Sequence, residues 1–145
     1  MLGPVKSALL ALCISISAAV MPAAAQSEAD TNASLDALYG DHKPYHQFFT
    51  TFQKAVADGD KAKVASLVDY PFQARIKGKA VKLRDAAHFI ADYDLIVTDK
   101  VKHAVAAQTY TGLFANWQGV MIGDGEVWFS GVGAAGTVKI TAIND

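Results

Sequence analysis

Cysteine is almost missing from this chain. The single cysteine, Cys13, lies in an apolar segment near the N-terminus. The rest of the chain therefore has no disulfide, no thiol nucleophile and no thiolate metal ligand. A domain of this size without disulfides has to be stabilised by its hydrophobic core alone.

An excess of charge of either sign is also lacking. The 13 Lys and Arg residues nearly balance the 14 Asp and Glu residues, so the net charge is −1 with neutral histidines. The charges are interspersed along the chain, and there is no basic stripe of the kind that binds nucleic-acid phosphates. We therefore expect no nucleic acid as a partner.

Long hydrophobic runs are absent except near the N-terminus. Residues 7–20 are apolar, but about 14 residues are fewer than the roughly 20 that a membrane-spanning helix needs. Lys6 precedes this run, and residues 21–25 follow it with a proline and an Ala-x-Ala site. This pattern predicts a signal peptide, residues 1–25, cleaved before Gln26. We expect a periplasmic or secreted protein with no membrane span after cleavage; the alternative is a retained anchor.

Motifs that specify a chemistry are missing as well. The chain has no Gly-x-Ser-x-Gly nucleophile turn and no His-Glu-x-x-His metal motif. His42 and His46 are four residues apart, but Pro44 lies between them where a helix is expected to begin, so we do not expect a shared helical face. His88 and His103 lie beside the apolar stripes of later predicted helices. We expect surface or boundary histidines, no metal site and no cofactor.

Apolar spacing predicts four helices in a single α+β domain, residues 41–145. Residues 26–40 are small and polar, which predicts a flexible lead-in with about one helical turn near its end. Apolar residues that recur with a helical period from Tyr45 predict a helix over 44–58. Further helices are predicted at 60–68, 85–96 and 99–108, with Asp60, Asp85 and Thr98 as N-caps.

The strands are predicted from alternating apolar residues. Residues 72–77 and 80–83 form a small hairpin, and three antiparallel strands are expected at 113–122, 126–131 and 137–143. Asp124-Gly125 between two apolar runs is the strongest hairpin signal in the chain. If these two residues form the loop, Met121 lies opposite Trp128.

This order of elements, with the late hairpin of residues 118–129, resembles the NTF2-like superfamily, which includes ketosteroid-isomerase-like and SnoaL-like proteins. The resemblance implies N-terminal helices packed on a curved, mostly antiparallel sheet that forms a cone with a pocket. The two helices 85–96 and 99–108 depart from it, since many members have one helix there. A cystatin-like α+β domain is the alternative. No catalytic motif accompanies the resemblance.

The late hairpin is the best candidate site, because both of its faces are apolar. One face is an ordinary core surface. The other face combines two tryptophans, a methionine and a carboxylate: Trp117, Met121, Trp128 and Glu126. With Tyr93 and Arg75 as further polar partners, this face predicts a pocket wall for a flat organic ligand. The alternative is that a helix covers this face and that both tryptophans belong to the core.

Three functions stay open. The first is an exported, non-enzymatic domain that binds a small apolar ligand or a protein partner through this face. The second is a small isomerase or lyase that uses a pocket acid or base. Its candidate groups are Asp69, Asp94, Glu126 and His88. The third is a structural or inhibitory partner in the envelope, for example a homodimer formed through the sheet.

Overall fold

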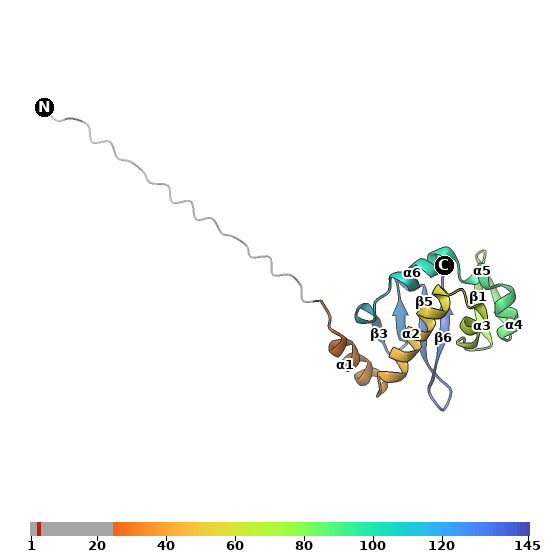
Figure 1. Ribbon diagram of the computed structural model, residues 1–145, viewed down its shortest axis with the longest axis horizontal. Helices are drawn as coiled ribbons and strands as arrows, with labels where there is room; N and C mark the ends of the chain where they lie inside the picture. The colour runs from red at the N-terminus through yellow and green to blue at the C-terminus, as the bar shows by residue number, and fades with distance from the viewer. Residues whose placement is uncertain (1–2, 4–24) are drawn as a thin grey trace.

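The computed structural model describes Gly3 and residues 25–145 (Figure 1). The predicted signal peptide, residues 1–25, lies outside this part of the chain except for Gly3 and Ala25. The described residues form an α+β fold in which helices pack against antiparallel sheets. Every helix among them is too short or too polar to span a membrane.

The helices agree closely with those predicted from apolar spacing, except for an additional one at the N-terminus. The helices are α1 (Glu28–Tyr39), α2 (Lys43–Ala57), α3 (Lys61–Ser66), α4 (Ala86–Ala91), α5 (Tyr93–Ile96), α6 (Asp99–Ala107) and the 3-10 helix η1 (Tyr110–Gly112). The predicted helix 85–96 is divided at Asp92, whose backbone is not helical. Each predicted N-cap side chain accepts a backbone N–H three residues later, as a capping residue should. The three caps are Asp60, Asp85 and Thr98.

The strands form two separate antiparallel sheets. The small sheet is a hairpin of β1 (Phe72–Ile76) and β2 (Lys79–Leu83). The larger sheet contains β3 (Phe114–Asn116), β4 (Gly119–Ile122), β5 (Val127–Val132) and β6 (Thr137–Ile143), in that spatial order. A parallel bridge between Val68 and Ile140 attaches the segment before β1 to the edge of β6.

Residues 26–40 are not a flexible lead-in, and that prediction is wrong. They form α1, which begins with a capping box: the Ser27 hydroxyl accepts the Asp30 N–H, and the Asp30 carboxylate accepts the Ser27 N–H. Thr31 and Leu35 are buried, and α1 packs against η1 and β3. The helix is stabilised by this distant contact, which its small, polar composition did not indicate.

The single strand predicted over 113–122 is also wrong, because the chain reverses within it. The Asn116 side chain accepts the Gln118 N–H at 2.8 Å, and Asn116 pairs with Gly119 across the turn. Gly119 has φ +146°, a conformation that favours glycine. This Asn-x-x-Gly turn separates β3 from β4 and places Trp117 at its tip.

The core lies between α2 and one face of the larger sheet. Figure 1 shows α2 lying across this sheet. The Phe48 ring of α2 is 4.9 Å from the Phe129 ring of β5, centroid to centroid. Fully buried side chains line this inner face of the sheet: Val120, Ile122, Val127, Phe129 and Ile140. The inner face is thus filled with side chains.

Replacing Gly119 with alanine tests the close approach of β4 to β5. A Cβ at Gly119 would lie 2.8 Å from the Phe129 carbonyl oxygen, so both backbone strain and overlap oppose it. We expect Gly119→Ala to lower the free energy of unfolding by at least about 3 kcal/mol in urea titrations. Gly133 is the matched control: it has φ +68° and open space around its Cβ position, so Gly133→Ala should cost about 1 kcal/mol. Equal losses would contradict the proposed overlap.

Candidate functional site

The outer face of the larger sheet carries the candidate site. The predicted register is confirmed, since Met121 pairs with Trp128 and Ile122 pairs with Val127. Phe114 pairs with Met121 on the other side. Because directly opposed residues share a face, Phe114, Met121 and Trp128 form one apolar row across β3, β4 and β5. Met121 and Trp128 are half-buried, and 51% of Phe114 is exposed.

The turn between β4 and β5 brings a carboxylate to the end of this row. Glu126 accepts the Asp124 N–H through Oε2 at 2.6 Å, and the side chain of Gln108, the C-cap residue of α6, accepts the Gly123 N–H at 2.8 Å. Gly123 has φ +66°, and a Cβ at this position would overlap the Glu126 carboxylate. The Glu126 side chain therefore helps to hold the turn.

A shallow hollow of about 330 Å³ lies where the turn meets the row. Met121, Glu126 and Trp128 line it, as do Lys100 and Asp124. A second hollow of about 490 Å³, between α6 and the turn, shares Lys100, Asp124 and Glu126 with the first. Three of the six predicted site residues thus meet at one surface depression, of a volume that small ligands occupy.

Trp117 does not share this hollow, although the sequence predicted that it would. It lies in the turn between β3 and β4, and 83% of it is exposed. Phe114, which was not predicted as a site residue, takes the place in the row that the single-strand prediction gave to Trp117. The asparagine at 116 and the glycine at 119 were the signal in the sequence for a chain reversal at Trp117, because both residue types favour turns. That reversal would have placed Phe114 in the row and Trp117 outside it.

Tyr93 and Arg75 also lie apart from the hollow. Tyr93 is buried in the helical layer, with its ring 6.1 Å from the Phe89 ring. Its hydroxyl has no hydrogen-bond partner among the described residues. Arg75 is exposed on β1 and donates to the Gly78 carbonyl at 3.3 Å. Neither side chain lines the depression beside Trp128.

The remaining acid–base candidates are surface groups. Asp69 is exposed, and His88 lies 2.7 Å from the exposed Asp85 carboxylate. The Lys61 ammonium, 2.7 Å from Asp94, holds the pKa of that carboxyl below its usual value. A carboxylic acid that acts as a general acid or base at neutral pH needs a raised pKa, which burial away from water produces. These groups do not have the environment of a catalytic acid.

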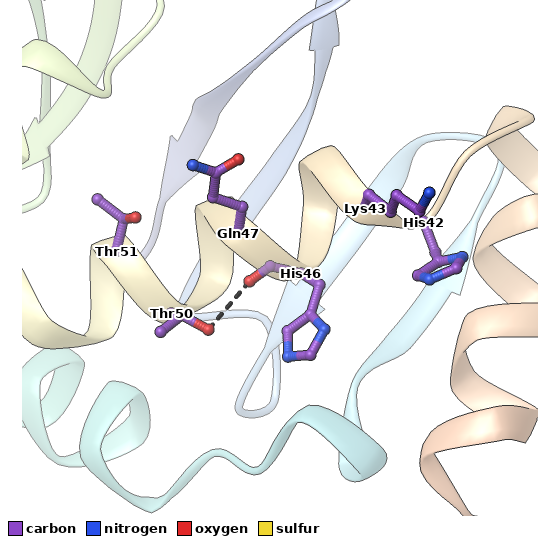
Figure 2. Close-up of a pocket in the computed structure, with 6 residues that line it drawn as sticks. All are labelled: His42, Lys43, His46, Gln47, Thr50 and Thr51. Atoms are coloured by element: carbon purple, nitrogen blue, oxygen red, sulfur yellow. Dashed lines mark hydrogen bonds between the residues drawn. The ribbon is translucent and has the colours of Figure 1, made fainter.

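The histidines near the N-terminus of α2 are arranged differently from the prediction. The backbone is already helical at His42, and His46 N–H donates to the His42 carbonyl at 2.9 Å. Pro44 is accommodated because an N–H in the first helical turn needs no helical partner. His42 and His46 therefore lie on one face of α2, where both line a hollow of about 350 Å³ (Figure 2).

Replacing Tyr93 with phenylalanine tests the unpaired hydroxyl. A buried polar group without a partner lowers stability, so Tyr93→Phe should leave the free energy of unfolding unchanged or raise it by about 1 kcal/mol. The control is Tyr39→Phe, because the Tyr39 hydroxyl donates to the Asn116 carbonyl at 2.6 Å. That variant should lose about 1 kcal/mol. A clear loss in Tyr93→Phe would show that the hydroxyl has a partner.

The Lys61–Asp94 pair predicts a dependence of stability on pH. The folded-state pKa of Asp94 lies below its ordinary value of 3.8, so its stabilisation is present above that pH and is lost as the pH falls through the folded pKa. Asp94→Asn should therefore lower the urea midpoint at pH 6 and lower it less at pH 2. Asp69→Asn, at an exposed position, is the control at both pH values. An equal effect of Asp94→Asn at pH 2 and pH 6 would contradict the ion pair.

Comparison with protein-family models, curated proteins and solved structures finds no match to this chain. The function proposed below is accordingly argued from the chain's own residues.

Proposed function

We propose that this chain is an exported binding module that takes a protein partner on the outer face of its larger sheet. The observation that carries the proposal is the 83% exposure of Trp117 in the turn that follows β3, the strand that carries Phe114 of the apolar row. Tryptophan, phenylalanine and methionine are enriched at protein interfaces. Export follows from the predicted signal peptide and is part of the same proposal.

The size of the surface favours a limited contact. An aromatic side chain offers about 150–250 Å², so the exposed parts of Trp117 and Phe114 supply roughly 300 Å² of apolar surface. That is a typical size for a functional patch on a monomer. It is less than half of the roughly 800 Å² per partner in a standard interface. The patch suits the centre of an interface whose rim is polar.

The NTF2-like arrangement remains part of the proposal, with the binding surface moved outward. Helices over an antiparallel sheet support that arrangement, whereas the inner face is occupied by the aromatic side chains of α2 and β5. A small flat ligand is the second candidate, favoured by the hollow of about 330 Å³ beside Trp128. Catalysis receives no such support, since Asp69, His88 and Asp94 are exposed and the Glu126 carboxylate accepts a hydrogen bond that holds the turn.

Photo-crosslinking tests the docking surface. A photoreactive phenylalanine analogue placed at Trp117 should give one discrete heavier species in cells that make the protein, and Phe114→Ser should abolish it. The same analogue at Leu95, which is 45% exposed on α5, is the matched control and should give none. Phe114→Ser should change the free energy of unfolding by no more than about 0.5 kcal/mol, as is usual for a surface site.

The same experiment separates the remaining possibilities. A species of twice the chain mass that contains only this protein would assign a homodimer through the sheet. Absence of any adduct at position 117, or equal adducts at positions 117 and 95, would contradict the docking surface.

A further inference from the structure

We infer that the junction of α1 and α2 binds a divalent transition-metal ion through Asp36, Asp41 and His42. Asp36 lies in α1, Asp41 lies in the loop that connects α1 to α2, and His42 is the N-cap residue of α2. One ligand atom from each of the three lies within 4.8 Å of the other two. This site is separate from the sheet face, and the inference does not depend on the proposed function.

The spacing of the ligand atoms suits a shared ion. His42 Nδ1 lies 2.8 Å from Asp36 Oδ1. Two ligands that bind one ion at about 2.1 Å lie roughly 3.0 Å apart at an octahedral angle and roughly 3.4 Å apart at the tetrahedral angle of zinc, so a small separation of Asp36 from His42 admits the ion. Asp41 Oδ1 accepts the Lys43 N–H at 3.0 Å, and Asp41 Oδ2 makes no side-chain hydrogen bond within the described part of the chain. The ion would replace the proton shared by His42 and Asp36.

The backbone fixes the three ligands before any ion binds. Gly40 ends α1 in the left-handed conformation, with φ +88°, and its N–H donates to the Asp36 carbonyl at 2.8 Å. The His42 N–H donates to Asp36 Oδ1 at 2.7 Å. These contacts hold the end of α1 against the start of α2. Little conformational entropy is therefore lost when the ion binds.

The site is accessible from solvent. The His42 side chain is 23% exposed and the Asp36 side chain is 46% exposed. The hollow lined by His42, Lys43 and His46 adjoins the site on its His42 side (Figure 2). Three protein ligands leave further coordination positions for water.

One imidazole and two carboxylates determine which metals the site prefers. Imidazole suits zinc, copper and nickel, whereas magnesium and calcium prefer oxygen ligands alone. Because the imidazole must be unprotonated to bind, zinc binding weakens as the pH falls. Lys43 follows His42 directly in the chain and lines the same hollow, so its ammonium carries a positive charge close to the ligands. The same positive charge opposes a cation, so Lys43→Gln should strengthen zinc binding.

Two other histidines provide matched controls. His88 and Asp85 form an imidazole–carboxylate pair at 2.7 Å, but they do not belong to a group of three ligands in the described chain. The His46 ring stacks on Tyr110, with centroids 3.9 Å apart, and its Nδ1 faces Glu28 at 3.9 Å. This stacking holds His46 outside the assigned ligand set.

Titration calorimetry with zinc chloride, on the chain without its predicted leader, tests the site. We expect one zinc ion per chain, with His42→Asn and Asp36→Asn each weakening the affinity at least tenfold. His88→Asn and His46→Asn should keep the affinity within about threefold. Circular dichroism of each variant checks that α1 and α2 are still folded; asparagine is a good N-cap, so His42→Asn should retain them.

Five results would overturn the assignment. No zinc binding by the folded wild-type chain, or unchanged affinity in His42→Asn, would exclude His42 as a ligand. Equal loss in His88→Asn would indicate general surface binding. Equal loss in His46→Asn would indicate a helical histidine pair instead of the assigned set. Magnesium that binds as tightly as zinc would indicate a purely acidic surface.

Discussion

The packing of the aromatic stripe of α2 against the inner sheet face is the interaction on which the rest of this structure depends. Phe52 is fully buried, and the Phe48 ring lies 4.9 Å from the Phe129 ring. A chain of this size without a disulfide has this core as its main source of stability. Because the alternation of β4 and β5 assigns their other residues to the opposite face, burying Phe129 also fixes where Trp128 lies. The candidate binding face is thus a consequence of the core.

α1 limits how that face can be used. Its last residue, Tyr39, donates a hydrogen bond to the Asn116 carbonyl and stacks on Tyr45, with centroids 4.4 Å apart. An open edge at β3 would invite pairing with another strand. Because Tyr39 of α1 already donates to the Asn116 carbonyl at this edge, a partner is more easily bound on the face of the sheet than as an added strand beside β3. The same helix carries Asp36, so α1 connects the two proposed sites through one rigid element.

Local signals predicted most of the fold. The helical period from Tyr45, the caps at Asp60 and Asp85, and the Asp124-Gly125 turn each depend on residues a few positions apart. For that reason most elements from α2 onward, though not the turn between β3 and β4, could be predicted from the sequence, as could the register of Met121 with Trp128. Part of the site was predictable as well: strand alternation around this turn places Met121, Trp128 and Glu126 on one face of the hairpin.

What the sequence by itself determined is therefore most of the elements from α2 onward, without the reversal that divides β3 from β4, and the pairing of β4 with β5. The tertiary structure decided what lies next to what. α1 is ordered because Leu35 is buried among residues far away in the chain, which no local pattern records. Tyr93 is buried in the helical layer, whereas Trp128 lies on the sheet, and this separation also depends on contacts between distant parts of the chain. Asp36 and His42 meet because Gly40 ends α1 in the left-handed conformation and α2 begins a few residues later, a juxtaposition that residue spacing alone cannot specify.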